Sequence, residues 1–454
     1  MPNRPVVPFR QKDDFYYERG QDALEQEDCL KANRYYRMVY DRDRQNEEAC
    51  LFLAENYCCA GRYERALEIL SVIPANGEFS PEFYFGMGNV LCFLDCPNEA
   101  SDMLCRYLMR DRDGDYAFDA QEILEDLQAQ LEMDTDEEAE MRIRVRHLYR
   151  LLLCGQTERA WEWVRLHRYM PEWHSFDFPD PEYPDWMADA VADVLVSAGE
   201  KGFKGSKRID ASILRKDPEH LHARIRSAYR ALRSGNRDAA IRQLRAVKKP
   251  VMADERIRLA DAWLHLGDAE ASGVLLDSVL SEFPYCQEAA FLEADRLFSI
   301  GKAREGTDML KMLLQLDPED AGIRYYLERW REEWTGLPME RFFWFPVPPE
   351  SYIRQANVLA KGLLEKRDAP DPERMRALLP LLSGKNFLAL TSAVLSGRIE
   401  SLYADLRQQL LRERLSDSDK QEALELVSRA GFLPPYLVRI DGHLMRAVVY
   451  EEKL

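Results

Sequence analysis

Small and apolar residues recur along much of the chain with helical spacing, and the pattern itself then repeats. The repeat is clearest between Ala253 and Asp320, where Gly267 is followed 34 residues later by Gly301, and Pro284 by Pro318. A fixed period of this length is typical of a pair of antiparallel helices that can bury its apolar face only against the next pair. The pattern therefore predicts two stacked helical hairpins in this stretch.

The same period appears in three consecutive units near the N-terminus, spanning residues 13–46, 47–80 and 81–114. Gly20 and Gly88 take the same place in the first and third units, where two helices approach too closely for a larger side chain. Gly61 stands where the second unit must turn between its helices, and glycine permits the positive φ that ends a helix. Three units in the same phase predict a regular array from residue 13 onward.

Two segments rich in proline and aromatic residues interrupt this pattern. Residues 171–186 hold four prolines, which rule out a continuous helix, and residues 335–349 form a second such segment, beyond which the 34-residue layout is absent. We therefore expect an N-terminal repeat block over 13–170, a junction over 171–186, a second block with a capping helix over 187–334, a linker over 335–349, and a C-terminal helical domain over 350–454.

The C-terminal domain is expected to end in a short β-hairpin. Asp441 and Gly442 form a strong signal for a two-residue type I′ turn, and apolar and β-branched residues flank them on both sides. A lone hairpin is only marginally stable, so we expect it to dock on the last helices. The segment 417–426 loosely resembles the second helix of a HEAT-type repeat. The predicted fold class is all-α, a solenoid of helical hairpins followed by this helical domain.

The repeat units resemble the tetratricopeptide-repeat superfamily over roughly residues 13–334, most clearly at 47–80 and 253–320. The resemblance implies a right-handed superhelix whose inner face, lined by the first helix of each unit, holds a peptide or a partner domain. It implies no catalysis. One subfamily binds a C-terminal carboxylate with basic and Asn side chains at fixed positions on three first helices. This carboxylate clamp is absent from the present sequence, because the equivalent positions hold Tyr17, Gln21, Phe52, Glu82 and Gly86.

The candidate partner-binding residues lie in both blocks. In the second block, residues 201–249 contain 15 Lys and Arg but only 4 Asp and Glu, within a chain of net charge -18. Two interpretations stay open: a solvated face balanced by the acidic residues 111–140 or by a neighbouring subunit, or a surface that attracts an acidic partner, nucleic acid included. The candidates are Tyr17, Gln21, Phe52 and Tyr57 in the first block, and His222, Arg226, Tyr229, Arg230 and Arg233 in the second.

The overall charge narrows the classes of partner. A strongly negative chain is not attracted as a whole to nucleic acid or to anionic membranes. No window reaches the roughly 18 apolar residues that a membrane-spanning helix needs, so we expect a cytoplasmic protein without a membrane partner. The nine cysteines fall mostly within helical patterns, which indicates reduced thiols in a core.

Candidate chemistry is sparse. Residues 111–122 place acids like those of a calcium-binding loop, but Tyr116 stands where that loop needs glycine, so we expect a solvated turn, with calcium as the alternative. The sequence shows no Ser, His and acid arrangement and no strong Cys and His ligand spacing, so we expect no catalytic residue, no metal, no cofactor and no enzyme. The predicted function is a scaffold for protein–protein interaction through the inner groove. The alternative is a nucleic-acid-associated or regulatory protein that uses residues 201–249.

Overall fold

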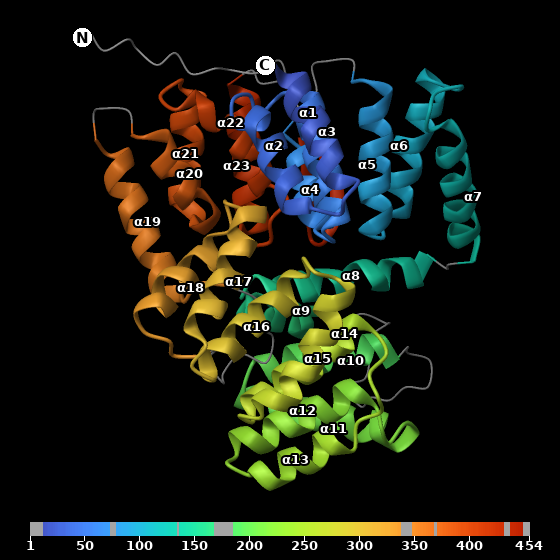
Figure 1. Ribbon diagram of the computed structural model, residues 1–454, viewed down its shortest axis with the longest axis vertical. Helices are drawn as coiled ribbons and strands as arrows, with labels where there is room; N and C mark the ends of the chain where they lie inside the picture. The colour runs from blue at the N-terminus through green and yellow to red at the C-terminus, as the bar shows by residue number, and fades with distance from the viewer. Residues whose placement is uncertain are drawn as a thin grey trace. The chain divides into compact units, whose positions relative to one another are not determined.

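The computed structural model describes residues 12–72, 79–133, 136–167, 185–336, 347–366, 370–430 and 436–447, and these are almost entirely helical (Figure 1). The chain forms two compact units, unit 1 from Met1–Met133 with Leu433–Tyr436, and unit 2 from Asp134–Phe432 with Leu437–Leu454. The division between the units falls after Met133, and the expected bounds of the repeat blocks stay a prediction. Most of the proline-rich junction (168–184) and of the linker (337–346) lies outside the described residues.

Unit 1 is an array of helical hairpins. Helices α1, α3 and α5 begin at residues 13, 47 and 81, which is the predicted 34-residue spacing, and each packs against the helix that follows it. The helices of unit 1 are α1 (Asp13–Leu24), α2 (Cys29–Tyr40), α3 (Glu47–Cys59), α4 (Tyr63–Leu70), α5 (Pro81–Phe93), α6 (Pro97–Arg110) and α7 (Ala117–Met133).

Local sequence explains where these helices begin and how closely they pack. The side chain of Asn46 accepts a hydrogen bond from the backbone N–H of Ala49, which caps the start of α3. Gly61 has a φ of 71°, as a residue that ends a helix requires. At Gly20 a Cβ atom would lie 2.1 Å from the Tyr36 ring, so only glycine permits this approach of α1 to α2. The expectations for both glycines are confirmed.

Unit 2 begins with five more hairpins and a capping helix. The hairpins are α8–α9, α10–α11, α12–α13, α14–α15 and α16–α17, and α18 packs against α17. Their bounds are α8 (Asp136–Leu153), α9 (Thr157–His167), α10 (Asp185–Ser197), α11 (Glu200–Lys216), α12 (Leu221–Arg233), α13 (Arg237–Arg245), α14 (Ala253–His265), α15 (Ala269–Glu282), α16 (Gln287–Ser299), α17 (Ala303–Leu316) and α18 (Ala321–Glu332).

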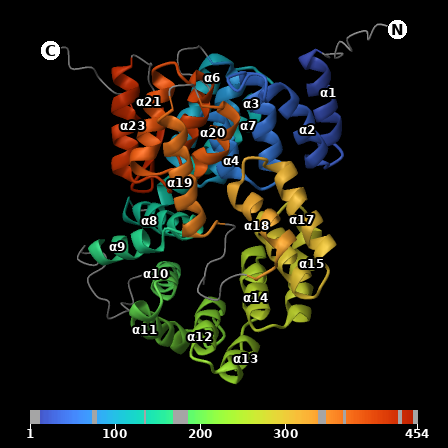
Figure 2. The same cartoon turned by 90° about the vertical axis from the view of Figure 1, so that its left-hand side faces the viewer.

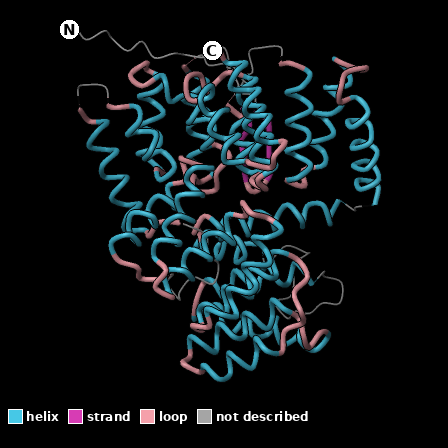
Figure 3. The backbone as a smooth tube through the Cα atoms, in the orientation of Figure 1, coloured by secondary structure: helices cyan, strands magenta, loops and turns pink. Residues whose placement is uncertain are grey.

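The C-terminal part of unit 2 consists of shorter helices and one hairpin, whose two strands are the only strands among the described residues (Figure 3). Asp441 and Gly442 have φ values of 47° and 84°, which confirms the predicted turn. The weak HEAT-type resemblance stays a prediction. The elements are α19 (Glu350–Leu364), α20 (Pro372–Leu378), η2 (Leu379–Leu381), α21 (Gly384–Leu395), η3 (Glu400–Leu402), α22 (Tyr403–Gln409), α23 (Asp417–Arg429), β1 (Tyr436–Ile440) and β2 (His443–Ala447).

The hairpin docks between the end of unit 2 and its beginning. Lys420 Nζ, on α23, donates to the carbonyl oxygen of Arg439 over 2.6 Å, as expected for docking on the last helices. In addition, Trp163 Nε1, on α9, donates to Asp441 Oδ1 over 2.8 Å. Gly442 lies so close to α8 that a Cβ atom there would be 2.7 Å from the Cβ of His147. The hairpin thus joins α23 to the first hairpin of the unit.

Further contacts close unit 2 on itself. Arg414 Nη2 donates to the carbonyl oxygen of Cys154, at the end of α8, over 3.4 Å. Val347 packs against Gly155 in the α8–α9 turn, and its carbonyl oxygen accepts a hydrogen bond from Tyr326 of α18 over 3.2 Å. Figure 2 shows α8 and α9 between the C-terminal helices and α10. The segments that follow the solenoid of unit 2 therefore contact the hairpin with which the solenoid begins.

Candidate functional site

Asp193, on α10, is the centre of a buried ion network on the first helices of four successive hairpins. Its side chain has no solvent exposure. Its Oδ1 accepts a hydrogen bond from Arg226 Nη1 of α12 over 2.8 Å. Its Oδ2 accepts from Arg258 Nη1 of α14 over 3.0 Å and from Tyr149 Oη of α8 over 3.2 Å. One carboxylate therefore ties α8, α12 and α14 to α10.

The guanidinium of Arg226 is also fully buried, and it meets three carboxylates. Besides Asp193, it donates through Nη2 to Asp189 over 2.5 Å and through Nε to Asp210 over 2.7 Å. Asp210 in turn pairs with Arg230 Nη2 at 2.6 Å. Moving a guanidinium from water into the interior has a large free-energy cost. Charged hydrogen bonds of this kind offset that cost, which stays uncompensated when the group is unpaired.

The network sets the protonation of the groups around it. Burial lowers the pKa of His222 to about 3, and the charge of Arg258 adds to this effect. Nη1 of Arg258 lies 3.2 Å from Nδ1 of His222, which accepts as part of a neutral imidazole. Burial alone would raise the pKa of the Asp193 carboxyl, but Arg226 and Arg258 outweigh it and hold that pKa below its ordinary value. The site is thus ionised at Asp193 and neutral at His222.

The candidate arginines within residues 201–249 differ in exposure. Arg226 is in the interior, Arg230 is largely buried against Asp210, and Arg233, at the end of α12, is exposed with its guanidinium 5.4 Å from the Phe203 ring centroid. The three arginines therefore do not form one exposed stripe. The carboxylates that neutralise the first two belong to unit 2 itself.

Sequence reasoning missed Asp189 and Asp193, although a signal was present. They stand four residues apart on α10, a helix that is otherwise mostly apolar, and so lie on one of its faces. Acids placed regularly on an apolar helix are seldom buried without a cationic partner. Such a pair indicates buried cations on a neighbouring element.

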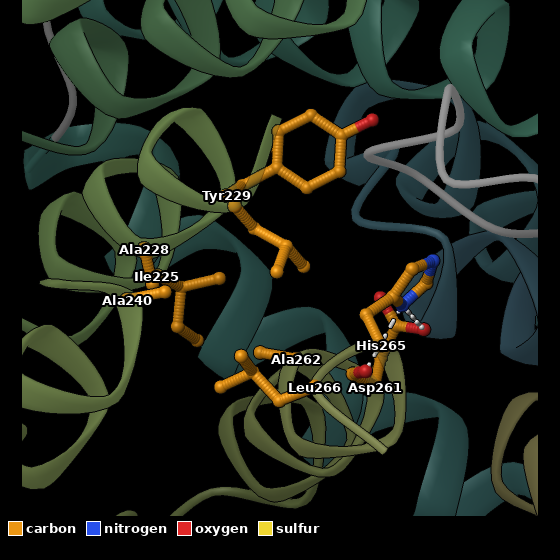
Figure 4. Close-up of a pocket in the computed structure, with 9 residues that line it drawn as sticks. Ile225, Ala228, Tyr229, Ala240, Asp261, Ala262, His265 and Leu266 are labelled. Atoms are coloured by element: carbon orange, nitrogen blue, oxygen red, sulfur yellow. Dashed lines mark hydrogen bonds and ion pairs between the residues drawn. The ribbon is translucent and has the colours of Figure 1, made fainter. Parts of the chain in front are cut away.

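A small cavity lies between α12, α13 and α14 (Figure 4). Its volume of about 20 Å³ is enough for one water molecule. His265 Nδ1 lies 3.0 Å from the backbone oxygen of Asp261 and 3.1 Å from its Oδ1, whereas Nε2 is buried without a hydrogen-bond partner among the described residues. Burial acts to lower the pKa of His265, but the Asp261 carboxylate outweighs it and raises that pKa to about 9. The lining residues are Ile225, Ala228, Tyr229, Leu232, Ala240, Asp261, Ala262, His265 and Leu266.

The first helices of unit 1 present a different surface. Asp14, Glu48 and Glu82 occupy the same place on α1, α3 and α5, and all three are exposed. Within the residues that the structure describes, none of them forms an ion pair. Tyr116, 34 residues after Glu82, takes this place just before α7 and is 42% exposed. Unlike Asp193, these carboxylates are not paired with cations of the described chain.

Aromatic rings accompany these carboxylates. Phe85 and Tyr116 stack with their ring centroids 4.5 Å apart, and Phe52 stacks on Tyr36 at 5.3 Å. Gln21 Nε2 donates to Glu55 Oε2 over 3.4 Å, which links the surfaces of α1 and α3. We call the surface residues of this region the first-helix face of unit 1, which comprises Asp14, Gln21, Glu48, Phe52, Glu55, Glu82, Phe85 and Tyr116.

The structure separates the four candidates of the first block. Gln21 and Phe52 lie on the first-helix face, partly exposed. Tyr17 is only 5% exposed, with its ring against Phe52, and Tyr57 has no exposure. Sequence reasoning missed Glu55, although it stands 34 residues after Gln21 and the period itself points to it.

The acidic segment 111–122 is a short turn followed by helix. Helix α6 ends at Arg110 and α7 begins at Ala117, so the last six residues of the segment are helical and no twelve-residue loop forms. The backbone N–H of Tyr116 donates to Tyr107 Oη over 3.0 Å. Within the described ranges, no three His, Cys, Asp or Glu side chains are arranged to hold a metal ion. In the same ranges, no helix combines the length and the apolar character needed to cross a membrane.

The sequence has no match among curated proteins. Among solved structures, the chain is similar to Cut9–Hcn1 from the APC/C (14% identity, 93% of this chain and 96% of that chain, TM-score 0.31). It is also similar to a tetratricopeptide repeat protein from Parabacteroides merdae (11% identity, 70% of this chain and 97% of that chain, TM-score 0.25). A third similar structure is yeast Tom70 (14% identity, 92% of this chain and 91% of that chain, TM-score 0.26). With TM-scores below 0.5, these similarities support no conclusion about this chain.

A family model described as tetratricopeptide repeat matches residues 23–87, which run from the end of α1 into α5. This match covers the second 34-residue unit and parts of the first and third. Residues 23–87 therefore match the tetratricopeptide repeat, the superfamily that the sequence pattern resembles.

Proposed function

We propose that this chain is a non-enzymatic scaffold that binds a protein partner on the first-helix face of unit 1. The observation that supports the proposal is the contrast between the two units. In unit 2, the first helices α8, α10, α12 and α14 use their polar side chains to hold one another. In unit 1, the equivalent helices carry exposed carboxylates, of which Asp14, Glu48 and Glu82 form no ion pair within the described residues. They also carry aromatic rings that are partly exposed.

The composition of this face suits recognition. Aromatic side chains provide large contact areas with little loss of rotamer freedom, and they are enriched among the residues that dominate binding energy. Phe52, Phe85 and Tyr116 are each held by ring stacking, so their orientation is fixed before a partner arrives. A preorganised surface loses less entropy on association.

The proposal is tested by capture from an extract of the native cell on the immobilised full chain. We expect Glu48→Lys together with Tyr116→Ala to abolish retention of a specific protein. The matched control is Glu122→Lys with Glu125→Lys, two exposed positions on α7 outside the first-helix face. The retained protein is then purified and titrated calorimetrically against both variants. Equal affinity for the two variants would contradict the proposal.

The alternative, an acidic partner on residues 201–249, has less support than the sequence indicates. Arg226 and Arg230 are engaged by Asp189, Asp193 and Asp210. Exposed cations remain, such as Arg233, and salt-dependent retention of the chain on DNA or RNA would measure their effect. We do not propose nucleic acid as the partner.

A further inference from the structure

We propose that the first-helix face of unit 1 binds a positively charged peptide segment, rich in lysine or arginine, of its protein partner. This inference rests on the proposed function and specifies its ligand. The first observation is the distribution of charge. Residues 12–133 contain 27 Asp and Glu but only 12 Lys and Arg, so this part of the chain accounts for most of the net charge of -18. A cationic segment is attracted to this unit over a distance of roughly one Debye length, ~10 Å.

The second observation is that the excess charge has a regular arrangement on the face. Asp14, Glu48 and Glu82 repeat at 34-residue spacing on three adjacent helices, without an ion pair to the described chain. Partial burial raises the pKa of Glu48, and the nearby charges of Asp14 and Asp13 raise it further. Carboxylates that repel one another are stabilised when a cation is placed between them.

The third observation is the position of the aromatic rings among these carboxylates. Tyr116 takes the place equivalent to Glu82 in the repeat, and the charges of Glu55 and Glu82 contribute, after burial, to the raised pKa of its hydroxyl. Tyr116 also stacks on Phe85. An ammonium or guanidinium group above an aromatic face gains about 0.5–1 kcal/mol at an exposed site. Rings beside carboxylates therefore favour a Lys or Arg side chain over a simple apolar one.

The fourth observation is a buried hydroxyl without a partner. Tyr36 has no solvent exposure, and its Oη lacks a hydrogen-bond partner among the described residues. After burial, the charge of Glu55 is the largest cause of the raised pKa of Tyr36. Glu55 itself accepts the long hydrogen bond from Gln21. In the proposed complex a cation displaces Gln21 from Glu55, because a charged pair is stronger than this long hydrogen bond.

The spacing of the helices indicates which peptides fit. Packed helices lie about 8–10 Å apart. A polyproline II segment rises about 3.1 Å per residue and presents every third side chain on one side, about 9 Å apart. A peptide with a cation at every third position therefore matches the stripe formed by Asp14, Glu48 and Glu82.

The test uses the full chain and three labelled twelve-residue peptides, in which every third residue is Lys, Glu or Ser and the rest are Ala and Pro. Binding is followed by fluorescence anisotropy at about 50 mM and about 300 mM salt. We expect the Lys peptide alone to bind, more weakly at the higher salt concentration. Glu48→Gln with Glu82→Gln should weaken this binding roughly five- to thirtyfold, the effect of losing two partly exposed ion pairs.

Matched variants separate a binding effect from a folding effect. Glu122→Gln with Glu125→Gln removes the same charge from the exposed side of α7 and should leave the affinity unchanged. Removing repelling carboxylates should not lower the thermal midpoint, which is measured for every variant. Binding of the Glu peptide, absence of Lys-peptide binding at low salt, or equal weakening by both double variants would overturn the inference. If the Lys peptide fails while a captured protein still depends on Glu48 and Tyr116, the inference fails and the proposed function stands.

Discussion

Arg226 and Asp193 form an ion pair of 2.8 Å in which neither side chain has any solvent exposure. Their charges are separated from water by α10, α12 and α14, and each has further partners in the network. Removing one member of such a pair leaves the other charge buried, with its desolvation cost uncompensated. The stability of unit 2 should depend strongly on this contact.

We predict that Asp193→Ala destabilises the chain by about 3–5 kcal/mol. The matched control is Asp22→Ala, which removes the partner of Arg19 in a surface pair of 3.5 Å whose side chains are 54% and 59% exposed. Exposed pairs contribute about 0–1 kcal/mol, so this control should change stability little. Urea denaturation monitored by circular dichroism measures both. Similar losses for the two variants would show that the network is not important for stability.

Acid should destabilise unit 2 through His222. Its pKa is lowered from 6.5 to about 3 in the folded chain, so the unfolded chain binds an additional proton between these values. The free energy of unfolding should therefore fall as the pH decreases from about 6.5 towards 3. His222→Gln, which keeps an acceptor without a titration in this range, should reduce that slope. An unchanged slope between about pH 6 and pH 4 would contradict the assignment.

Alkaline pH should destabilise the same unit through His265, because the pKa of this side chain is raised, whereas that of His222 is lowered. The pKa is raised from 6.5 to about 9 beside Asp261, so the folded chain retains a proton that the unfolded chain loses. The stabilisation, at most roughly 3 kcal/mol, is complete below pH 6.5 and is lost as the pH rises through 9. Thermal unfolding of wild type and His265→Gln across this range should give curves that converge at high pH. Parallel curves would show that the two groups are not coupled.

Gly442→Ala should loosen the docking of the C-terminal hairpin. The residue has a φ of 84°, and a Cβ atom would lie 2.7 Å from that of His147, so both backbone strain and overpacking result. We expect a loss of about 2–4 kcal/mol. Gly397→Ala is the control, because its φ of 78° gives similar strain but no atom lies within 4 Å of the added Cβ. The fluorescence of Trp163, which donates to Asp441, should change only in the first variant.

The sequence predicts local features of this fold well. The 34-residue period places α1, α3 and α5, because each helical hairpin has the same length and packs in the same way against the next. Asp441 and Gly442 place the hairpin turn, since its conformation needs residues that tolerate positive φ. Both features depend on a few adjacent residues or on a strict repetition, and both can be found without a structure.

The candidate sites were harder to predict, because they depend on burial and on contacts between distant segments. The count of charged residues over 201–249 does not show that Arg226 is buried. Its partner Asp193 lies outside that range, so the count does not include it. Tyr149 and Arg258 meet at Asp193 although two hairpins lie between theirs in the chain, and such a meeting of distant segments leaves no local pattern. The division after Met133 likewise follows from packing, since α8 and α9 pack against α10.

The contacts of the α8–α9 turn with Val347 and Arg414 have a consequence for how the chain folds during synthesis. An open solenoid can grow from one end, because every unit contacts only its neighbours. In unit 2, the partners of Cys154 and Trp163 are more than 250 residues further along the chain. At roughly 5–20 residues per second, the ribosome needs on the order of 10 s or more to supply them. During that interval α8 and α9 are without the contacts that Arg414 and Asp441 later supply, so this hairpin completes its packing only late in synthesis.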